Sequence, residues 1–150
     1  MSYQEKNTTV SFVSHLLILG YYLLNWFHMY QAGGLNADRV FRLWAIVIIA
    51  AIIVNIVSTI LTNIVLSIVH AIKTQSKEEE RFIEDERDHL IDLKGTRVSY
   101  VSFSIGVLLA MLTFAFGQPP LVMFSLLIFA GIFAQITGDL SQIYLYRRGF

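Results

Sequence analysis

Asp139 and His15 are the residues of this chain whose types and positions best suit chemistry. Asp139 is the only carboxylate inside a long apolar segment, and an ionisable side chain within a membrane span is by default a candidate functional residue. Counted from the same end of the predicted bundle, His15 lies at a similar depth, so the two can pair. Such a pair could relay protons or simply hold two helices together. Alternatively, Asp139 could reach water or meet Arg147 or Arg148 near the end of its segment.

A second candidate is a set of acidic side chains in the one long hydrophilic segment, residues 76–97. They recur every four residues, which places them on one face of a helix. We call this set the acidic row; it consists of Glu80, Glu84, Asp88 and Asp92. Ser76 and Glu79 have the form of a capping box, and Gly95 can end a helix, so we predict a separate helix over residues 77–94.

Like charges at this spacing repel one another, so we expect a basic surface to complete the acidic row. Arg81 and Arg87 lie on neighbouring faces and relieve only part of the repulsion. The complement could be the Arg147–Arg148 tail of the same or a neighbouring copy, or a basic cytoplasmic protein. The alternative is an ordinary solvated helix face.

Other chemical signatures are scarce. The chain has no cysteine, which excludes disulfides, thiolate metal sites and a cysteine nucleophile. Glu86 and His89 form a Glu-x-x-His sequence, half of a di-iron carboxylate motif, but no second copy follows. No phosphate-binding loop or nucleophile elbow is present, and no basic patch interleaves with aromatic residues. We therefore expect no metal, no cofactor and no nucleic-acid partner.

The remaining sequence predicts a single all-α membrane domain over residues 1–150. Hydrophobic residues make up 55% of the chain and charged residues 15%, with a mean hydropathy of +0.61. Four segments are long enough to cross about 30 Å of hydrocarbon as helices. The predicted spans are residues 10–30, 43–72, 98–116 and 121–146, the last interrupted by polar residues near its end. Residues 31–42 should form a loop with room for a short interfacial helix, and residues 117–120 a tight turn.

Two of these spans have a distinctive face. In residues 43–72, polar side chains at steps of four should point inward, either bonding neighbouring helices or lining a solute path. They are Asn55, Thr59, Asn63 and Ser67. In residues 98–116, small side chains at steps of three or four predict a close helix–helix contact. They are Ser99, Ser102, Gly106, Ala110 and Thr113.

Basic residues are unevenly divided between the two predicted sides of the membrane. One side holds nine of the eleven Lys and Arg residues: Lys6, Lys73, Lys77, Arg81, Arg87, Lys94, Arg97, Arg147 and Arg148. The other side has only Arg39 and Arg42. Because positive charge is retained in the cytoplasm, we expect a plasma-membrane protein with both termini and the acidic row inside.

The run Glu84-Asp85-Glu86-Arg87-Asp88, followed by Ile91, Lys94-Gly95, Arg97 and Tyr100 between paired hydrophobic spans, resembles a known signature. This is the Asp-Glu-Arg-Asp motif of a family of small predicted prokaryotic membrane proteins of unknown function. The resemblance covers about seventeen residues. It implies a bacterial or archaeal cytoplasmic membrane, and it supplies neither an activity nor a catalytic residue.

These observations favour a non-enzymatic regulatory or interaction protein that acts through the acidic row, by contact with a partner or with its own copies in a homo-oligomer. A small-solute or ion carrier is the alternative, because polar faces of the second and fourth spans could line a path in an oligomer. A membrane enzyme using Asp139 and His15 is third.

Overall fold

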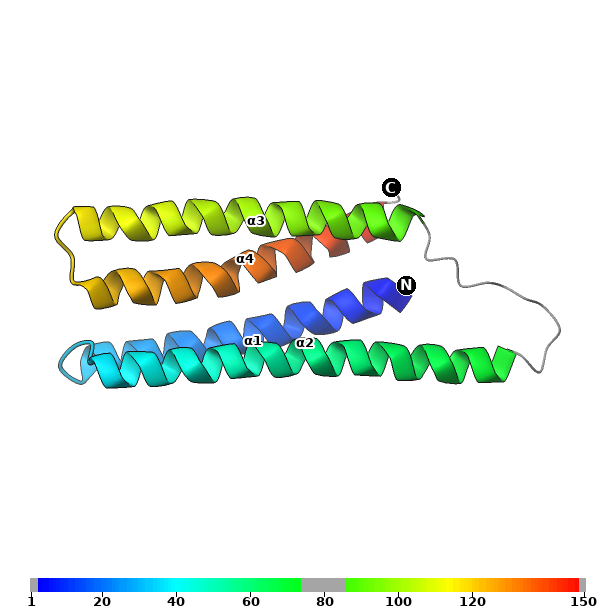
Figure 1. The fold of residues 1–150 in the computed structure, drawn as a ribbon, viewed down its shortest axis with the longest axis horizontal. Coiled ribbons are helices and arrows are strands. Elements are labelled where there is room, and N and C mark those ends of the chain that lie inside the picture. Colours follow the sequence, from blue (N-terminus) through cyan, green and yellow to red (C-terminus); the bar gives the residue numbers. More distant parts are fainter. Residues whose placement is uncertain (1–2, 74–85, 149–150) are drawn as a thin grey trace.

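The computed structural model describes residues 3–73 and 86–148, apart from the side chain of Tyr3 and several between residues 55 and 73. The described chain forms four α-helices and no strand, which confirms the predicted all-α class. These are α1 (Tyr3–Gln31), α2 (Ala37–Lys73), α3 (Glu86–Ala115) and α4 (Pro120–Arg148). The helices run alternately up and down, so the start of α1, the end of α2, the start of α3 and the end of α4 share one end of the bundle (Figure 1). We call this the terminal end and the opposite one the loop end.

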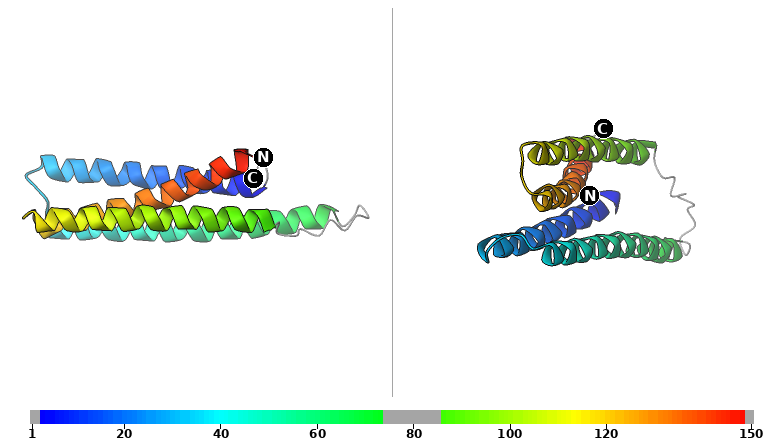
Figure 2. Two further views of the ribbon diagram at one scale, coloured as in Figure 1. Left: turned by 90° about the horizontal axis from the view of Figure 1, so that it is seen from above. Right: turned by 60° about the vertical axis from the view of Figure 1, so that its left-hand side comes forward.

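The helices form two hairpins stacked in the order α3, α4, α1, α2 (Figures 1 and 2). Helix α4 packs most extensively on α3 and also on α1, whereas α2 packs mainly on α1. Three helices, α1, α3 and α4, are each long and apolar enough to cross a membrane. At 37 residues, α2 is the longest, and it projects beyond the others at the terminal end (Figure 1).

The linker between α1 and α2 is shorter than the sequence predicted. Gly33 and Gly34 have φ angles of 107° and 112°, which side chains rarely tolerate, and they turn the chain after α1. Asn36 then caps α2, because its Oδ1 accepts the Asp38 amide at 3.0 Å. The predicted loop over residues 31–42 is therefore too long, because α2 begins at Ala37 and continues without a break.

Helix α3 differs most from expectation. The sequence predicts that a helix over residues 77–94 ends at Gly95 before a separate span. Residues 77–85 lie outside the described residues, but from Glu86 one helix runs through Gly95 to Ala115. Gly95 is buried, and a Cβ there would collide with the Gln142 side chain of α4. Its lack of a side chain permits close packing of α4 and does not end the helix.

The α3–α4 contact follows the predicted small-residue face. A Cβ at Gly106 would lie 2.5 Å from the Ala130 Cβ, and Gly138 has the Ser99 side chain directly over it. On α4, the matching surface is small at every fourth position, Ala130, Ala134 and Gly138, and all three are buried. Pro120 starts α4 at a helical position that needs no amide donor, after the turn at Gly117 with φ 82°. The polar residues near the end of α4 do not interrupt it.

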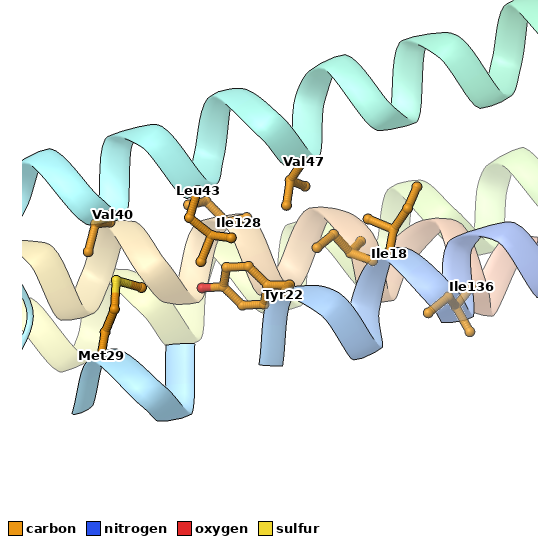
Figure 3. Close-up of a cluster of buried hydrophobic side chains, with 9 residues drawn as sticks. Ile18, Tyr22, Met29, Val40, Leu43, Val47, Ile128 and Ile136 are labelled. Atoms are coloured by element: carbon orange, nitrogen blue, oxygen red, sulfur yellow. The ribbon is translucent and has the colours of Figure 1, made fainter. Parts of the chain in front are cut away.

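A hydrophobic cluster joins α1, α2 and α4 nearer the loop end (Figure 3). Its buried members are Ile18, Tyr22, Met29, Val40, Leu43, Val47, Ile128, Ile132 and Ile136. Within it, the Tyr22 hydroxyl donates to the Ser125 carbonyl at 2.6 Å, so the one polar group of the cluster is satisfied. This cluster fixes the depth at which residues of α1 meet residues of α4.

Candidate functional site

His15 of α1 and Asp139 of α4 are in contact. His15 Nδ1 lies 2.7 Å from Asp139 Oδ2, and the two side chains are only 5% and 13% exposed. The contact between His15 and Asp139 that their similar depth predicts is therefore present. In the alternative, Asp139 would meet Arg147 or Arg148, but Arg147 bonds Glu5 and Arg148 bonds Tyr144.

Ser11 adds a hydroxyl to this pair but does not complete a catalytic triad. Its Oγ lies 3.5 Å from His15 Nδ1, the same nitrogen that contacts Asp139. In a Ser-His-Asp triad the serine and the carboxylate bind opposite ring nitrogens, so that the imidazole can take the serine proton. Here one nitrogen faces both groups, and this geometry does not activate Ser11.

The buried face of α1 changes character at His15. Toward the terminal end it carries the buried side chains of Glu5 and Thr8, and toward the loop end those of Ile18 and Tyr22. These positions recur at helical spacing, so they form one stripe against α4. Among the buried positions of α1, the pair thus lies between the polar Glu5 and Thr8 and the hydrophobic cluster.

Gln142 ties three helices together at the terminal end. Its Nε2 donates to Asp92 Oδ1 of α3 at 3.1 Å, and its Oε1 lies 3.3 Å from the Thr8 hydroxyl of α1. The same hydroxyl lies 3.0 Å from the Gln4 carbonyl oxygen. One turn further, Arg147 Nε contacts Glu5 Oε1 at 3.4 Å. Neither Gln142 nor Thr8 is among the predicted site residues; their spacing of three from Asp139 and of seven from His15 was the available signal.

The described half of the acidic row points at α4. The Asp88 carboxylate lies close to the Tyr146 side chain of α4, and Asp92 accepts a hydrogen bond from Gln142. Arg87 is half-buried, and within the described structure its Nε has no hydrogen-bond partner. Glu80 and Glu84 lie outside the described residues. Asp88 is half-buried and Asp92 is exposed, and both lie on the side of α3 that faces α4.

The predicted polar face of α2 can be placed only by its backbone. Asn55, Asn63 and Ser67 all lie within α2, but their side chains are outside the described part of the structure. The described α2 side chains that pack on the hydrophobic cluster are apolar: Ala50, Ala51 and Val54.

Two hollows between helices are apolar and lie away from the His15–Asp139 pair. One, of about 470 Å³, lies between α3 and α4 and includes Gly106, Ala110 and Phe133 in its lining. The other, of about 330 Å³, lies between α1 and α4 and includes Tyr22, Trp26 and Phe129. Neither offers the convergent polar groups that position a polar substrate. Comparison of the chain with protein families, curated proteins and solved structures finds no match.

Proposed function

We propose that this protein crosses the cytoplasmic membrane four times, with both termini in the cytoplasm, and acts by binding a partner rather than by catalysis. The charge distribution supports the orientation, because the basic residues gather where the terminal end lies. The fourth span would be α2, since residues 43–72 contain no Asp, Glu, Lys or Arg. The lack of an activated nucleophile beside His15 favours binding over an enzymatic role.

The continuity of α3 is the observation that carries the regulatory part of this proposal. The acidic first turns and the apolar remainder form one helix of 30 residues, without a hinge at Gly95. A partner that binds the acidic segment would therefore bind the same helix, α3, that packs against α4. The contacts of Asp92 and Asp88 would be the first affected, because Asp92 bonds Gln142 and Asp88 lies close to Tyr146. Binding of a basic cytoplasmic surface would in this way alter helix packing inside the membrane.

Reporter fusions test the orientation. A reporter joined after Phe150 should be active on the cytoplasmic side, and one inserted at Ala37 should report the opposite side, because an odd number of spans separates them. An external C-terminus would overturn the cytoplasmic assignment of the terminal end and, with it, the proposed partner site.

Charge removal in the acidic row tests the binding role. Changing Glu80 and Glu84 to Gln removes two charges while leaving Asp88 and Asp92 unchanged. Exposed ion pairs are individually weak, about 0–1 kcal/mol, and are screened by salt. We therefore expect the double variant at low salt to show weak cross-linking between copies and weak capture of cytoplasmic proteins. Both signals should be as low as those of the native protein at high salt.

The matched control removes the same charge from other faces of the segment. Glu78→Gln with Asp85→Asn also deletes two acids, but at positions outside the acidic row. This control should retain association at low salt. If both double variants behave like the native protein, the acidic row is a solvated face and the binding role fails.

A further inference from the structure

We propose that His15 and Asp139 form a proton-binding site that opens only toward the terminal end, and that its bound proton keeps α1 packed on α4. The inference rests on the proposed placement in a membrane but not on the binding of any partner. Its basis is a buried pair, the charge states available to that pair, and the asymmetry of the groups on either side.

The geometry favours one charge state over its neighbours. A separation of 2.7 Å between His15 Nδ1 and Asp139 Oδ2 is typical of a charge-assisted hydrogen bond. With an imidazolium facing a carboxylate, the pair has no net charge. Loss of that proton leaves a buried negative charge, and gain of a second leaves a buried positive charge. Because an uncompensated buried charge is costly, the packed bundle favours the pair with one shared proton.

Access to the site is one-sided. Toward the terminal end, polar groups lead away from the pair along both helices: Ser11 and Thr8 on α1, and Gln142 on α4. Toward the loop end, the next buried side chains are Ile18 of α1 and Ile136 of α4, which belong to the hydrophobic cluster. A proton therefore exchanges with the terminal side without crossing the cluster. This arrangement suits a sensor of the proton concentration on one side, and it offers no path through the α1–α4 interface.

The other charged groups around this interface lie toward the terminal end. On α1 the group is Glu5 and on α4 it is Arg147, and they contact each other. On α3, the residues opposite Gly138 are Gly95 and Ser99, neither of which titrates. The charged groups of α3 precede them: Glu86, Arg87, Asp88, Asp92 and Lys94. The described α2 side chains on the cluster are apolar.

Proton binding by the pair determines how the stability of the bundle should change with pH. Helices that separate expose both groups to water, where the pair loses its proton at alkaline pH and gains a second at acid pH. Stability falls wherever the separated helices bind a different number of protons from the packed bundle. The bundle should therefore be most stable at intermediate pH, with a fall on each side. Asp139→Asn should lose the alkaline fall, because no carboxylate is then left buried beside a neutral imidazole.

The test measures the imidazole directly in the full-length protein in lipid bilayers. Nitrogen NMR, with the His15 signal identified by its loss in His15→Gln, should show a protonated ring in the native protein and a neutral ring at the same pH in Asp139→Asn. In sealed vesicles of known orientation, the His15 signal should follow pH on the terminal side alone. A neutral ring in the native protein would refute the site, and a response to pH on the loop side would refute its sidedness.

Thermal unfolding across pH supplies an independent check with a matched control. Glu5→Gln removes the other carboxylate buried in the α1–α4 interface but leaves His15 and Asp139 in place. It should retain the alkaline fall in stability that Asp139→Asn loses. Equal alkaline behaviour of native protein, Glu5→Gln and Asp139→Asn would show that the pair does not link protons to packing.

Discussion

Gly106→Val is expected to force α3 away from α4 and to lower the free energy of unfolding by about 1–3 kcal/mol. A Cβ at residue 106 would lie 2.5 Å from the Ala130 Cβ, which cannot rotate away as a longer side chain could. The helices must therefore separate along a contact whose neighbouring positions, Ala110 and Ala134, are already buried. Unfolding of the full-length protein in mixed micelles, followed by loss of helical signal, measures the effect.

Two companion variants make this result specific. Gly20→Val is the same substitution in α1, at a position where an added Cβ has no neighbour within 4 Å, and it should cost little. Combining Gly106→Ala with Ala130→Gly moves one methyl group from α4 to α3 and should restore most of the stability that Gly106→Ala loses. If Gly20→Val costs as much as Gly106→Val, close approach at Gly106 does not determine the packing of this hairpin.

The sequence was sufficient for the broad architecture because that architecture follows from length, hydropathy and residue size. Apolar segments of span length predict the helices, and the small residues of α3 predict which face meets a neighbour. The depth of His15 and Asp139 along their helices was enough to anticipate their contact. Each of these inferences depends on one helix at a time or on a simple count from a shared end.

The direction in which Asp88 and Asp92 of the acidic row face depends on a helix boundary that the sequence leaves open. Glycine at residue 95 is compatible both with a helix end and with close packing, and only the position of Gln142 on α4 distinguishes the two. In one continuous helix, Asp88 and Asp92 precede Gly95 and Ser99 at steps of three or four. Asp88 and Asp92 therefore continue the small-residue face that packs on α4. If residues 77–94 were a separate helix, as the sequence predicts, the direction in which the acidic row faces relative to the spans would be undetermined.

Gln142 was missed for a related reason. Its side-chain amide bonds Asp92 and Thr8, which lie 50 and 134 positions away in sequence. No local sequence pattern therefore predicts these hydrogen bonds. Asn and Gln near a predicted span end usually indicate the lipid interface or bonding between helices, and composition does not separate these roles. Here the relative rotation of α1, α3 and α4 determines that Gln142 bonds neighbouring helices.

Separating Asp139 from His15 should produce the other large effect. Removing one partner from a buried ionic pair lowers the free energy of unfolding by about 3–5 kcal/mol, because the remaining group is then buried without a partner. Asp139→Ala and His15→Ala should therefore each lower the free energy of unfolding substantially. The double variant should be little worse than either single variant, because both remove the same interaction. The coupling energy from this cycle should therefore be about 3 kcal/mol, at the upper end of the range found for residues in direct contact.

A second cycle on the Glu5–Arg147 pair provides the comparison. That contact is longer, at 3.4 Å, and the Arg147 side chain is 67% exposed, so solvent screens it. Its coupling should be no more than about 1 kcal/mol, the usual limit for exposed ion pairs. Since both pairs join α1 to α4, the difference between the two cycles isolates the effect of burial. Additive losses at His15 and Asp139, or equal coupling in the two cycles, would mean that the buried pair contributes no special bond between these helices.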